Sequence, residues 1–333
     1  MAAALYDPQE GYYATGARIG ERGDFVTSPT ISPIFAATLA RRFAADVATI
    51  EGPVDFVDAG AGSGQFLEDF AAALARDHPG IAERLRLTAV ERSAAARKAI
   101  AERRIRPEPR ILESAEALGR ETISGWVLSN ELYDALPVVR VVCGAEGLDE
   151  MRVAWDSESF VWSRSPAPEA FREHLESFGV TLAPGQIAEI SFGAGPLHRT
   201  LAKALSRGSV VAFDYGHRAA VLYHPAARRA GTLVVHFGGL RRGDPLRHPG
   251  HVDLTAHVNW DLLIRAGEEE GLTGSRVVRQ GKFLLELGLF DFVSTSQEKW
   301  KAYRLVDPEG MGEELSALIQ TRSVRGDSGG ENG

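Results

Sequence analysis

Residues 54–67 read Val-Asp-Phe-Val-Asp-Ala-Gly-Ala-Gly-Ser-Gly-Gln-Phe-Leu, an apolar run followed by an acid and three glycines. The apolar run at 54–57 is typical of a short buried strand. Phe66, Phe70 and Leu74 then recur at helical spacing, so we expect a helix directly after the glycines. A strand, a glycine turn and a helix in this order form a ligand-binding edge of an open α/β sheet, because glycine lets the backbone approach a ligand closely.

The spacing of the glycines distinguishes between two kinds of nucleotide ligand. The motif is G-x-G-x-G after an acid, and it consists of Asp58, Gly60, Gly62 and Gly64. It lacks the longer G-x-G-x-x-G spacing of dinucleotide sites and favours S-adenosylmethionine (SAM), whose sulfonium and ammonium groups suit a carboxylate. Glu91 ends the next predicted strand, where an acid can bind both ribose hydroxyls. A tight turn with a solvated acid is the alternative, but acids at two successive strand ends favour an adenosyl ligand.

Composition excludes several classes of protein. The chain has 333 residues, 44% hydrophobic and 25% charged, which suits one large α/β domain with an elaboration or two domains. The formal net charge is −8 and no basic run stands out, so we expect no nucleic-acid partner. The single cysteine, Cys143, excludes an internal disulfide and a cysteine-built metal site. Without a signal-like N-terminus or a long apolar span, we expect a cytoplasmic protein with no membrane partner.

Strand-like and helix-like patterns alternate along the chain, which predicts a doubly wound α/β fold with a mostly parallel sheet. Expected strands include those at 54–58, 85–90, 110–112, 126–128, 208–216 and 231–237. The expected helices lie at 33–47, 65–75, 94–103 and, last in the chain, 311–321. Ser32-Pro33 is typical of an N-cap followed by proline at the first helical position.

A change of pattern after residue 137 predicts the domain organisation. Alternation at 138–142 and 151–162, broken by glycines, indicates an inserted β meander, and the aromatic, glycine-rich loops near the N-terminus could form a lid. The expected parts are an N-terminal lid and helix at 1–50, a SAM-binding core at 51–137, an inserted β/α subdomain at 138–206, the rest of the core with substrate-side elements at 207–322, and a disordered tail at 323–333.

At Asn130-Glu131 and Asp134-Ala-Leu-Pro137 the sequence resembles the MidA-like (DUF185) family of SAM-dependent methyltransferases. Other matching pieces follow in order along nearly all of residues 5–322: Leu5-Tyr6, Gly11-Tyr-Tyr13, Gly23-Asp24-Phe25, Thr27-Ser28, 58–64, Glu189-Ile-Ser191, Asp214-Tyr-Gly216, 249–258, Phe283-Leu-Leu285 and Met311-Gly312. The resemblance implies a class I, Rossmann-like methyltransferase fold. The family includes a mitochondrial protein arginine methyltransferase that assists assembly of respiratory complex I, so the resemblance implies a protein arginine acceptor.

The residues and the resemblance agree on the cofactor site. The glycines admit the methionine end of SAM, Asp58 interacts with that end, and Glu91 binds the ribose; a salt-bridged surface acid is the alternative for Glu91. Ser114, in the loop 114–118 after the third strand, is the candidate for adenine. Asn130, at the end of the fourth strand, is assigned to the same site.

Methyl transfer requires an aligned nucleophile more than a strong acid. Carboxylates suit an arginine acceptor, because guanidinium presents a planar fork of donors and must lose a proton as the new bond forms. Glu131 and Asp134 follow the fourth strand three residues apart, so a helical turn would place both on one side. Asp24, in the N-terminal glycine loop, is expected to close over the site. For Asp134, capping the segment that ends at Pro137 is an equal alternative.

Asp253 and His257 lie four residues apart and would face one way in a helix, where His257 could act as a general base. A structural histidine is the favoured alternative. Together with His248 and His251 these residues match no firm ligand spacing, so we predict no metal.

One departure from the family pattern leaves the acceptor open. Gly231-Thr-Leu233 is followed by Val234-Val-His-Phe-Gly-Gly239, without the arginine usual in the family. A small-molecule oxygen or nitrogen is therefore the alternative acceptor, and a non-catalytic assembly factor is a third hypothesis. The sequence leaves the oligomeric state open, with a homodimer as one option.

Overall fold

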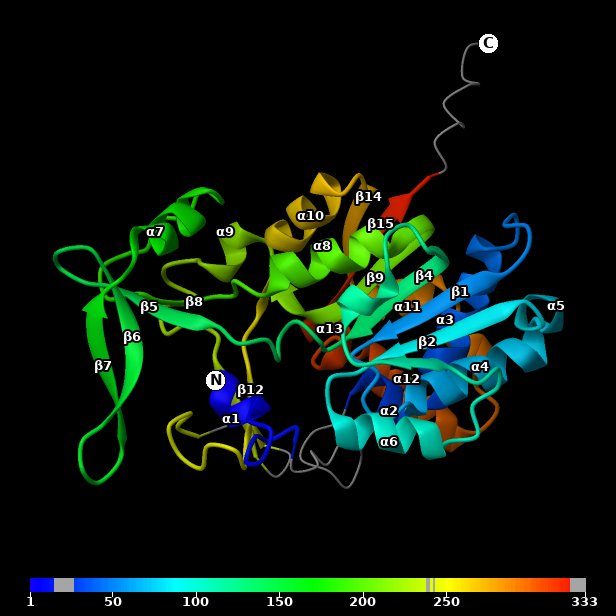
Figure 1. Cartoon of the computed structure of the whole chain (residues 1–333), viewed down its shortest axis with the longest axis horizontal. Helices are drawn as coiled ribbons and strands as arrows, with labels where there is room; N and C mark the ends of the chain where they lie inside the picture. The colour runs from blue at the N-terminus through cyan, green and yellow to red at the C-terminus, as the bar shows by residue number, and fades with distance from the viewer. Residues whose placement is uncertain (15–26, 238–239, 242, 324–333) are drawn as a thin grey trace, which may run out of the picture. The chain divides into compact units, whose positions relative to one another are not determined.

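The computed structural model describes residues 1–14, 27–237, 240–241 and 243–323 (Figure 1). The chain forms two compact units, each assembled from three segments. The first unit comprises Met1–Val26, Tyr133–Pro196 and Asp214–Leu263, and the second comprises Thr27–Leu132, Leu197–Phe213 and Ile264–Gly333. Most of the expected disordered tail and the loop that carries Asp24 lie outside the described residues.

The second unit is organised around a mostly parallel sheet with the strand order β14-β15-β9-β4-β1-β2-β3. Its parallel pairs are β1 with β2, β1 with β4, β2 with β3 and β4 with β9. The strands are β1 (Val54–Ala59), β2 (Leu85–Val90), β3 (Arg110–Leu112), β4 (Ile123–Asn130), β9 (Leu205–His217, whose residues 214–217 belong to the first unit), β14 (Thr273–Arg279) and β15 (Leu315–Arg322). The predicted α/β class is confirmed, with the second and third strands at their expected bounds.

Helices fill the connections between these strands. They are α2 (Ser28–Ile31), α3 (Pro33–Asp46), α4 (Gln65–Asp77), α5 (Pro79–Ala82), α6 (Ala94–Glu102), η1 (Ala115–Leu118), α11 (Gln280–Glu286), η2 (Leu289–Phe292), α12 (Ser296–Val306) and α13 (Met311–Glu314). Ser32 caps α3 as predicted, accepting a hydrogen bond from the Ile34 amide. Two further helices, α8 (Ala194–Ala204) and α10 (Trp260–Glu269), contain residues of both units.

An aromatic cluster joins the sheet to two of its helices. All six residues of β1 are buried, as expected for a strand covered on both faces. Phe43 of α3 packs with its ring centroid 5.5 Å from Phe56 of β1, 5.5 Å from Phe70 of α4 and 5.8 Å from Trp126 of β4. The apolar residues at helical spacing in α4 and the apolar strand at 54–57, both recognised in the sequence, therefore pack in one core.

The prediction of a final helix at 311–321 is wrong. Only Met311–Glu314 is helical, and Leu315–Arg322 forms β15, which lies between β14 and β9 and is antiparallel to β14. Residues 315–318 are all buried, so they show no alternation that would reveal a strand. A short run buried on both faces cannot be distinguished from a buried helix by periodicity.

The first unit contains two antiparallel sheets. One has the order β7-β6-β5-β8 and consists of β5 (Val139–Cys143), β6 (Leu148–Trp155), β7 (Phe160–Pro166) and β8 (Ile187–Ile190). The other has the order β11-β10-β12, with β10 (Val234–Phe237), β11 (Leu240–Arg241) and β12 (Asp253–Thr255). The helices α1 (Ala2–Tyr6), α7 (Glu169–Glu176) and α9 (Ala219–Leu222) complete the unit, and β13 (Val258–Asn259) pairs with the end of β9.

The N-terminal arm is anchored within the first unit. Leu5 and Tyr12 are buried in a cluster with Val235 and Leu254. The Tyr6 hydroxyl also donates a 2.9 Å hydrogen bond to the Ala135 carbonyl. These contacts fix the start of the chain by packing and hydrogen bonding together.

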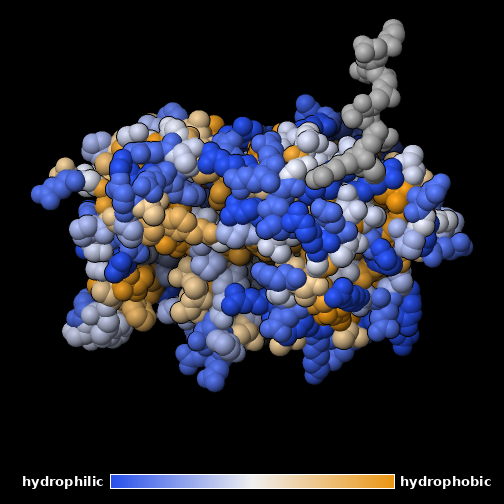
Figure 2. Space-filling model, turned by 45° about the horizontal axis from the view of Figure 1, so that its top comes forward, coloured by the Kyte–Doolittle hydropathy of each residue, from blue (hydrophilic) through white to orange (hydrophobic). Residues whose placement is uncertain are grey.

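The surface drawn in Figure 2 is mostly hydrophilic, with hydrophobic patches between the charged groups. Within the described part of the chain, no helix has the length and apolar character needed to cross a membrane.

Candidate active site

The glycine turn between β1 and α4 has a backbone that other residues adopt only with strain. Gly60, Gly62 and Gly64 have φ values of +81°, +52° and +77°. A Cβ on Gly60 would also lie 3.0 Å from Cδ1 of Leu132. The Gly60 amide donates a 2.8 Å hydrogen bond to the Val90 carbonyl at the end of β2. The turn is therefore fixed across the carboxyl ends of two neighbouring strands.

The structure brings Glu91 to this turn. One carboxylate oxygen of Glu91 accepts a 2.9 Å hydrogen bond from the Gly62 amide, and the other accepts a 2.7 Å hydrogen bond from the Ser93 amide. Burial raises the pKa of Glu91, while these hydrogen bonds act in the opposite direction. The carboxylate is thus oriented at the sheet edge, where it can accept hydrogen bonds from a diol.

Asp58 lies beneath the turn with only 4% of its surface exposed. Its carboxylate forms no hydrogen bond or ion pair with any residue that the structure describes. Burial, with a further contribution from the Glu91 charge, raises the pKa of Asp58 to about 7. A buried carboxylate without a partner is costly, so this position fits a cationic group such as the ammonium of SAM.

Arg103 was not recognised from the sequence, although it holds the turn in place. Its Nε donates a 2.6 Å hydrogen bond to the Ser63 carbonyl, and its guanidinium forms an ion pair with Glu68 of α4. Arg103 directly follows α6, so this contact ties the end of one helix to the start of another. A basic residue at a helix end is too common a signal to reveal such a role.

The end of β4 lies at the same edge of the sheet. Ala59 pairs with Ser129, which places Asn130 and Glu131 level with the start of the glycine turn. The Asn130 Nδ2 donates a 3.0 Å hydrogen bond to Glu131, and its Oδ1 is buried with no hydrogen-bond partner among the described residues. An unpartnered acceptor at this position suits a ligand donor.

Glu131 has a strained backbone. Its φ is +50°, in the left-handed region that disfavours side chains, and its amide donates a 2.8 Å hydrogen bond to the Phe213 carbonyl. The described residues include three other non-glycine residues with positive φ, and all are exposed: Glu121, Ser157 and His248. Strain held by surrounding structure is characteristic of functional positions and costs about 1–3 kcal/mol.

The prediction that Glu131 and Asp134 share one side of a helical turn is wrong. Residues 131–137 contain no helix, because the left-handed conformation of Glu131 prevents one from starting there. Asp134 belongs to the first unit and is only 4% exposed. Burial raises its pKa well above the ordinary value, with further contributions from the charges of Asp214 and Asp253. Its proposed catalytic role stays a prediction.

Asp214 was not among the residues chosen from the sequence. It is fully buried in β9, three residues before the strand ends, and accepts a 2.8 Å hydrogen bond from the Tyr133 amide and a 2.9 Å hydrogen bond from the Tyr215 amide. Asp253, also buried, accepts a 2.9 Å hydrogen bond from the Tyr13 hydroxyl. Asp134, Asp214 and Asp253 form a cluster of buried carboxylates. Asp214, the acid in the predicted strand at 208–216, was the signal in the sequence that could have revealed this cluster.

The prediction that Asp253 and His257 share a helical face is wrong as well. Asp253 lies in the extended strand β12, and His257 directly precedes β13. The His257 ring centroid is 5.6 Å from His217 and 6.3 Å from Tyr215. In the described ranges, no group of three or more His, Cys, Asp and Glu side chains could hold a metal ion.

Ser114 and Asp24 complete the set of predicted site residues. Ser114 is exposed and its carbonyl accepts a 3.3 Å hydrogen bond from the Ala117 amide in η1. Asp24 lies outside the residues that the structure describes.

Residues 38–278 match the family model described as "Putative S-adenosyl-L-methionine-dependent methyltransferase". The chain belongs to this family. A solved COG1565 superfamily member from Burkholderia thailandensis, bound to S-adenosyl-homocysteine, is 30% identical with a TM-score of 0.84, over 96% of this chain and 86% of that chain. The human "Protein arginine methyltransferase NDUFAF7, mitochondrial" is 25% identical over 98% of this chain and 80% of its own length. The Drosophila melanogaster homolog of that protein is 28% identical over 97% of this chain and 80% of its own length.

The protein is therefore a SAM-dependent methyltransferase of the MidA-like family, with SAM as its cofactor. The buried Asp58 carboxylate and the glycine turn fit this cofactor, since they offer charge and open backbone where its methionine end requires them. The curated relatives are named as mitochondrial, and the expected cytoplasmic location stays a prediction.

We expect SAM affinity to depend on pH through Asp58. The pKa of Asp58 is about 7 in the free protein, and the cationic ammonium favours the carboxylate form. Affinity should therefore rise as pH increases towards 7, by at most about tenfold per pH unit, and stop rising before about pH 8, where the ammonium itself begins to lose its proton. Calorimetric Kd values from pH 5.5 to 8.5 test this. The Asp58→Asn variant should bind weakly with a flat profile, and an equally steep profile in that variant would exclude Asp58 as the cause.

Proposed function

We propose that this methyltransferase methylates the guanidinium group of an arginine side chain in a protein partner. The observation that carries the proposal is Glu131, a carboxylate held beside the glycine turn at the carboxyl edge of the sheet. Carboxylates bind guanidinium through paired, charge-assisted hydrogen bonds. The proposal is supported by the relatives, named protein arginine methyltransferases, that align along nearly the whole chain.

Three side chains and the glycine turn are proposed to hold the cofactor. Glu91 accepts hydrogen bonds from the ribose, the turn at 60–64 lies against the methionine end, and Asp58 neutralises the ammonium. The Asn130 Oδ1, which lacks a partner among the described residues, accepts a further hydrogen bond at the same edge. When bound, SAM supplies an electrophilic methyl carbon on its sulfonium.

Glu131 then has two tasks. It orients one guanidinium nitrogen for in-line displacement, and its charge assists release of the proton from that nitrogen. As the carbon–nitrogen bond forms and the carbon–sulfur bond breaks, one proton is released. The methylated side chain keeps its positive charge and the sulfur becomes neutral, so charge balances. The strained position of Glu131 favours a fixed carboxylate over a mobile one.

A labelling experiment tests the proposal. The purified enzyme is incubated with SAM carrying a radioactive methyl group, together with either a protein extract or a metabolite extract of the source cells. We expect label in protein and, after acid hydrolysis, in methylarginine. Labelling of the metabolite extract alone would contradict the proposal and support the small-molecule alternative, which rests on the missing arginine after Leu233.

A further inference from the structure

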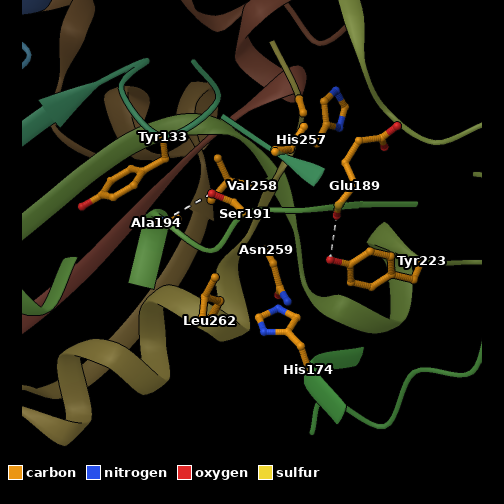
Figure 3. Close-up of a pocket in the computed structure, with 12 residues that line it drawn as sticks. Tyr133, His174, Glu189, Ser191, Ala194, Tyr223, His257, Val258, Asn259 and Leu262 are labelled. Atoms are coloured by element: carbon orange, nitrogen blue, oxygen red, sulfur yellow. Dashed lines mark hydrogen bonds between the residues drawn. The ribbon is translucent and has the colours of Figure 1, made fainter. Parts of the chain in front are cut away.

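A small pocket, with room for about one water-sized group such as a single carbonyl oxygen, opens within the first unit (Figure 3). Its lining comes from the segment after β4, from α7, from β8 and the chain up to the start of α8, from the residue after α9, and from the chain around β13 into α10. The lining residues that matter here are Val138, Glu189, Ser191, Val258, Asn259 and Leu262. None of the residues that line this pocket is a lysine or an arginine.

Asn259 reaches the pocket because β13 pairs closely with the end of β9. Val258 pairs with Gly216, and Asn259 pairs with His217. A Cβ on Gly216 would lie 2.6 Å from the Val258 carbonyl oxygen, so only glycine permits this approach. The position of Asn259 is therefore set by backbone packing.

The orientation of the Asn259 amide is fixed by one hydrogen bond. Its Oδ1 accepts a 3.0 Å hydrogen bond from the Asp261 amide at the start of α10, which leaves Nδ2 as the free end. The residue is only 7% exposed, and Nδ2 has no hydrogen-bond partner among the described residues. A buried donor without an acceptor is costly, which indicates that a ligand supplies the acceptor.

Ser191 provides a second donor on the same lining. Its Oγ accepts a 3.3 Å hydrogen bond from the Ala194 amide, as drawn in Figure 3, and its hydroxyl hydrogen has no acceptor in the described part of the chain. A hydroxyl donates one hydrogen bond while it accepts others. The two donors therefore call for an oxygen acceptor on the ligand.

The charged and titratable groups at the pocket favour a neutral ligand. Glu189 is already engaged by Arg140, at 3.0 Å, and by the Thr232 amide, at 2.6 Å. With this carboxylate neutralised and no lysine or arginine on the lining, the only basic side chains there are the imidazoles of His174 and His257, so a carboxylate ligand would find no permanent countercharge. A neutral carbonyl flanked by apolar groups suits the two donors and the side chains of Val138 and Leu262.

We propose that this pocket binds a backbone amide carbonyl of the polypeptide that is methylated, a specificity site in the first unit that rests on the proposed function for the identity of its ligand. Asn259 Nδ2 donates to the carbonyl oxygen, with the Ser191 hydroxyl as second donor. Such a site recognises a peptide main chain without requiring a particular side chain at that point.

Binding is tested without methyl transfer. The probe is N-acetylglycine N-methylamide, added to asparagine-labelled protein while the Asn259 side-chain signals are followed by nitrogen-15 NMR. We expect the probe to shift these signals in a saturable way and acetate to leave them unchanged. Absence of any shift, or an equal shift with acetate, would overturn the proposal. This result does not depend on the proposed function, whose failure would appear in the labelling experiment instead.

The matched variant is Asn259→Asp. Aspartate keeps the oxygen that accepts from the Asp261 amide, but it replaces the Nδ2 donor with a second carboxylate oxygen and adds a negative charge. With the methyl-accepting protein as substrate, KM should rise about tenfold while kcat and the SAM Kd change less than about twofold. Ser191→Ala should raise KM by a smaller factor in the same direction. An unchanged KM in Asn259→Asp, at an unchanged melting temperature, would overturn the proposal.

Discussion

Gly62→Arg is expected to abolish SAM binding and with it methyl transfer. Gly62 has a φ of +52°, and its amide donates to Glu91, so a large side chain at this position strains the turn and enters the space beside the carboxylate. In the native enzyme, SAM at about 100 times its Kd should stabilise the fold by about 2.7 kcal/mol. The variant should show no rise in melting temperature with SAM and no detectable transfer.

Gly52→Arg is the matched control for this substitution. Gly52 has a φ of +74°, lies in the same unit and has nothing within 4 Å of its virtual Cβ. It should share the backbone cost of about 1 kcal/mol while keeping the SAM-induced shift. If Gly62→Arg keeps a native SAM shift, the glycine turn is not the cofactor site.

Glu131→Gln is expected to lower kcat by about 100-fold, the scale of a lost acid–base group. Glutamine still offers an oxygen to the Asn130 Nδ2, so the local structure survives and only the charge is lost. The SAM Kd should change by less than about twofold, because the substitution acts on the acceptor. Initial rates with the identified acceptor, combined with calorimetry for SAM, separate these two quantities.

Glu121→Gln serves as control, since Glu121 is exposed, belongs to the second unit and has a similar φ of +52°. Its kcat should remain native. A native kcat in Glu131→Gln would remove this residue from the mechanism and leave the arginine proposal without its structural basis.

Much of the second unit could be predicted because its elements begin and end with strong local signals. The strand at 85–90 and the strand at 110–112 have their predicted bounds, and Gly64 directly precedes α4. The glycine turn also placed Asp58 and Glu91 at neighbouring strand ends, where the parallel pairing of β1 and β2 brings them together. These features depend on residues close in sequence.

The errors involve contacts between distant segments. Residues 315–322 became a strand because β9 and β14 offered edges on both sides, a fact that local periodicity does not contain. Glu131 and Asp134 were placed by helical spacing, but the left-handed Glu131 ended that geometry. The position of the Asn259 Nδ2 donor depends on the pairing of β13 with β9 and on the small size of Gly216. The sequence pattern around Asn259 reveals neither of these.

The most direct test of the cofactor site compares S-adenosylhomocysteine with its 2′,3′-dideoxy analogue, in the native enzyme and in Glu91→Ala. Removing the ribose hydroxyls is expected to weaken native binding at least about tenfold, or about 1.4 kcal/mol, because the Glu91 carboxylate accepts from both hydroxyls. In Glu91→Ala the two ligands should bind with Kd values within about twofold of each other. An equal loss in both proteins, measured by calorimetry, would show that Glu91 does not bind the ribose and would contradict the placement of SAM at this edge of the sheet.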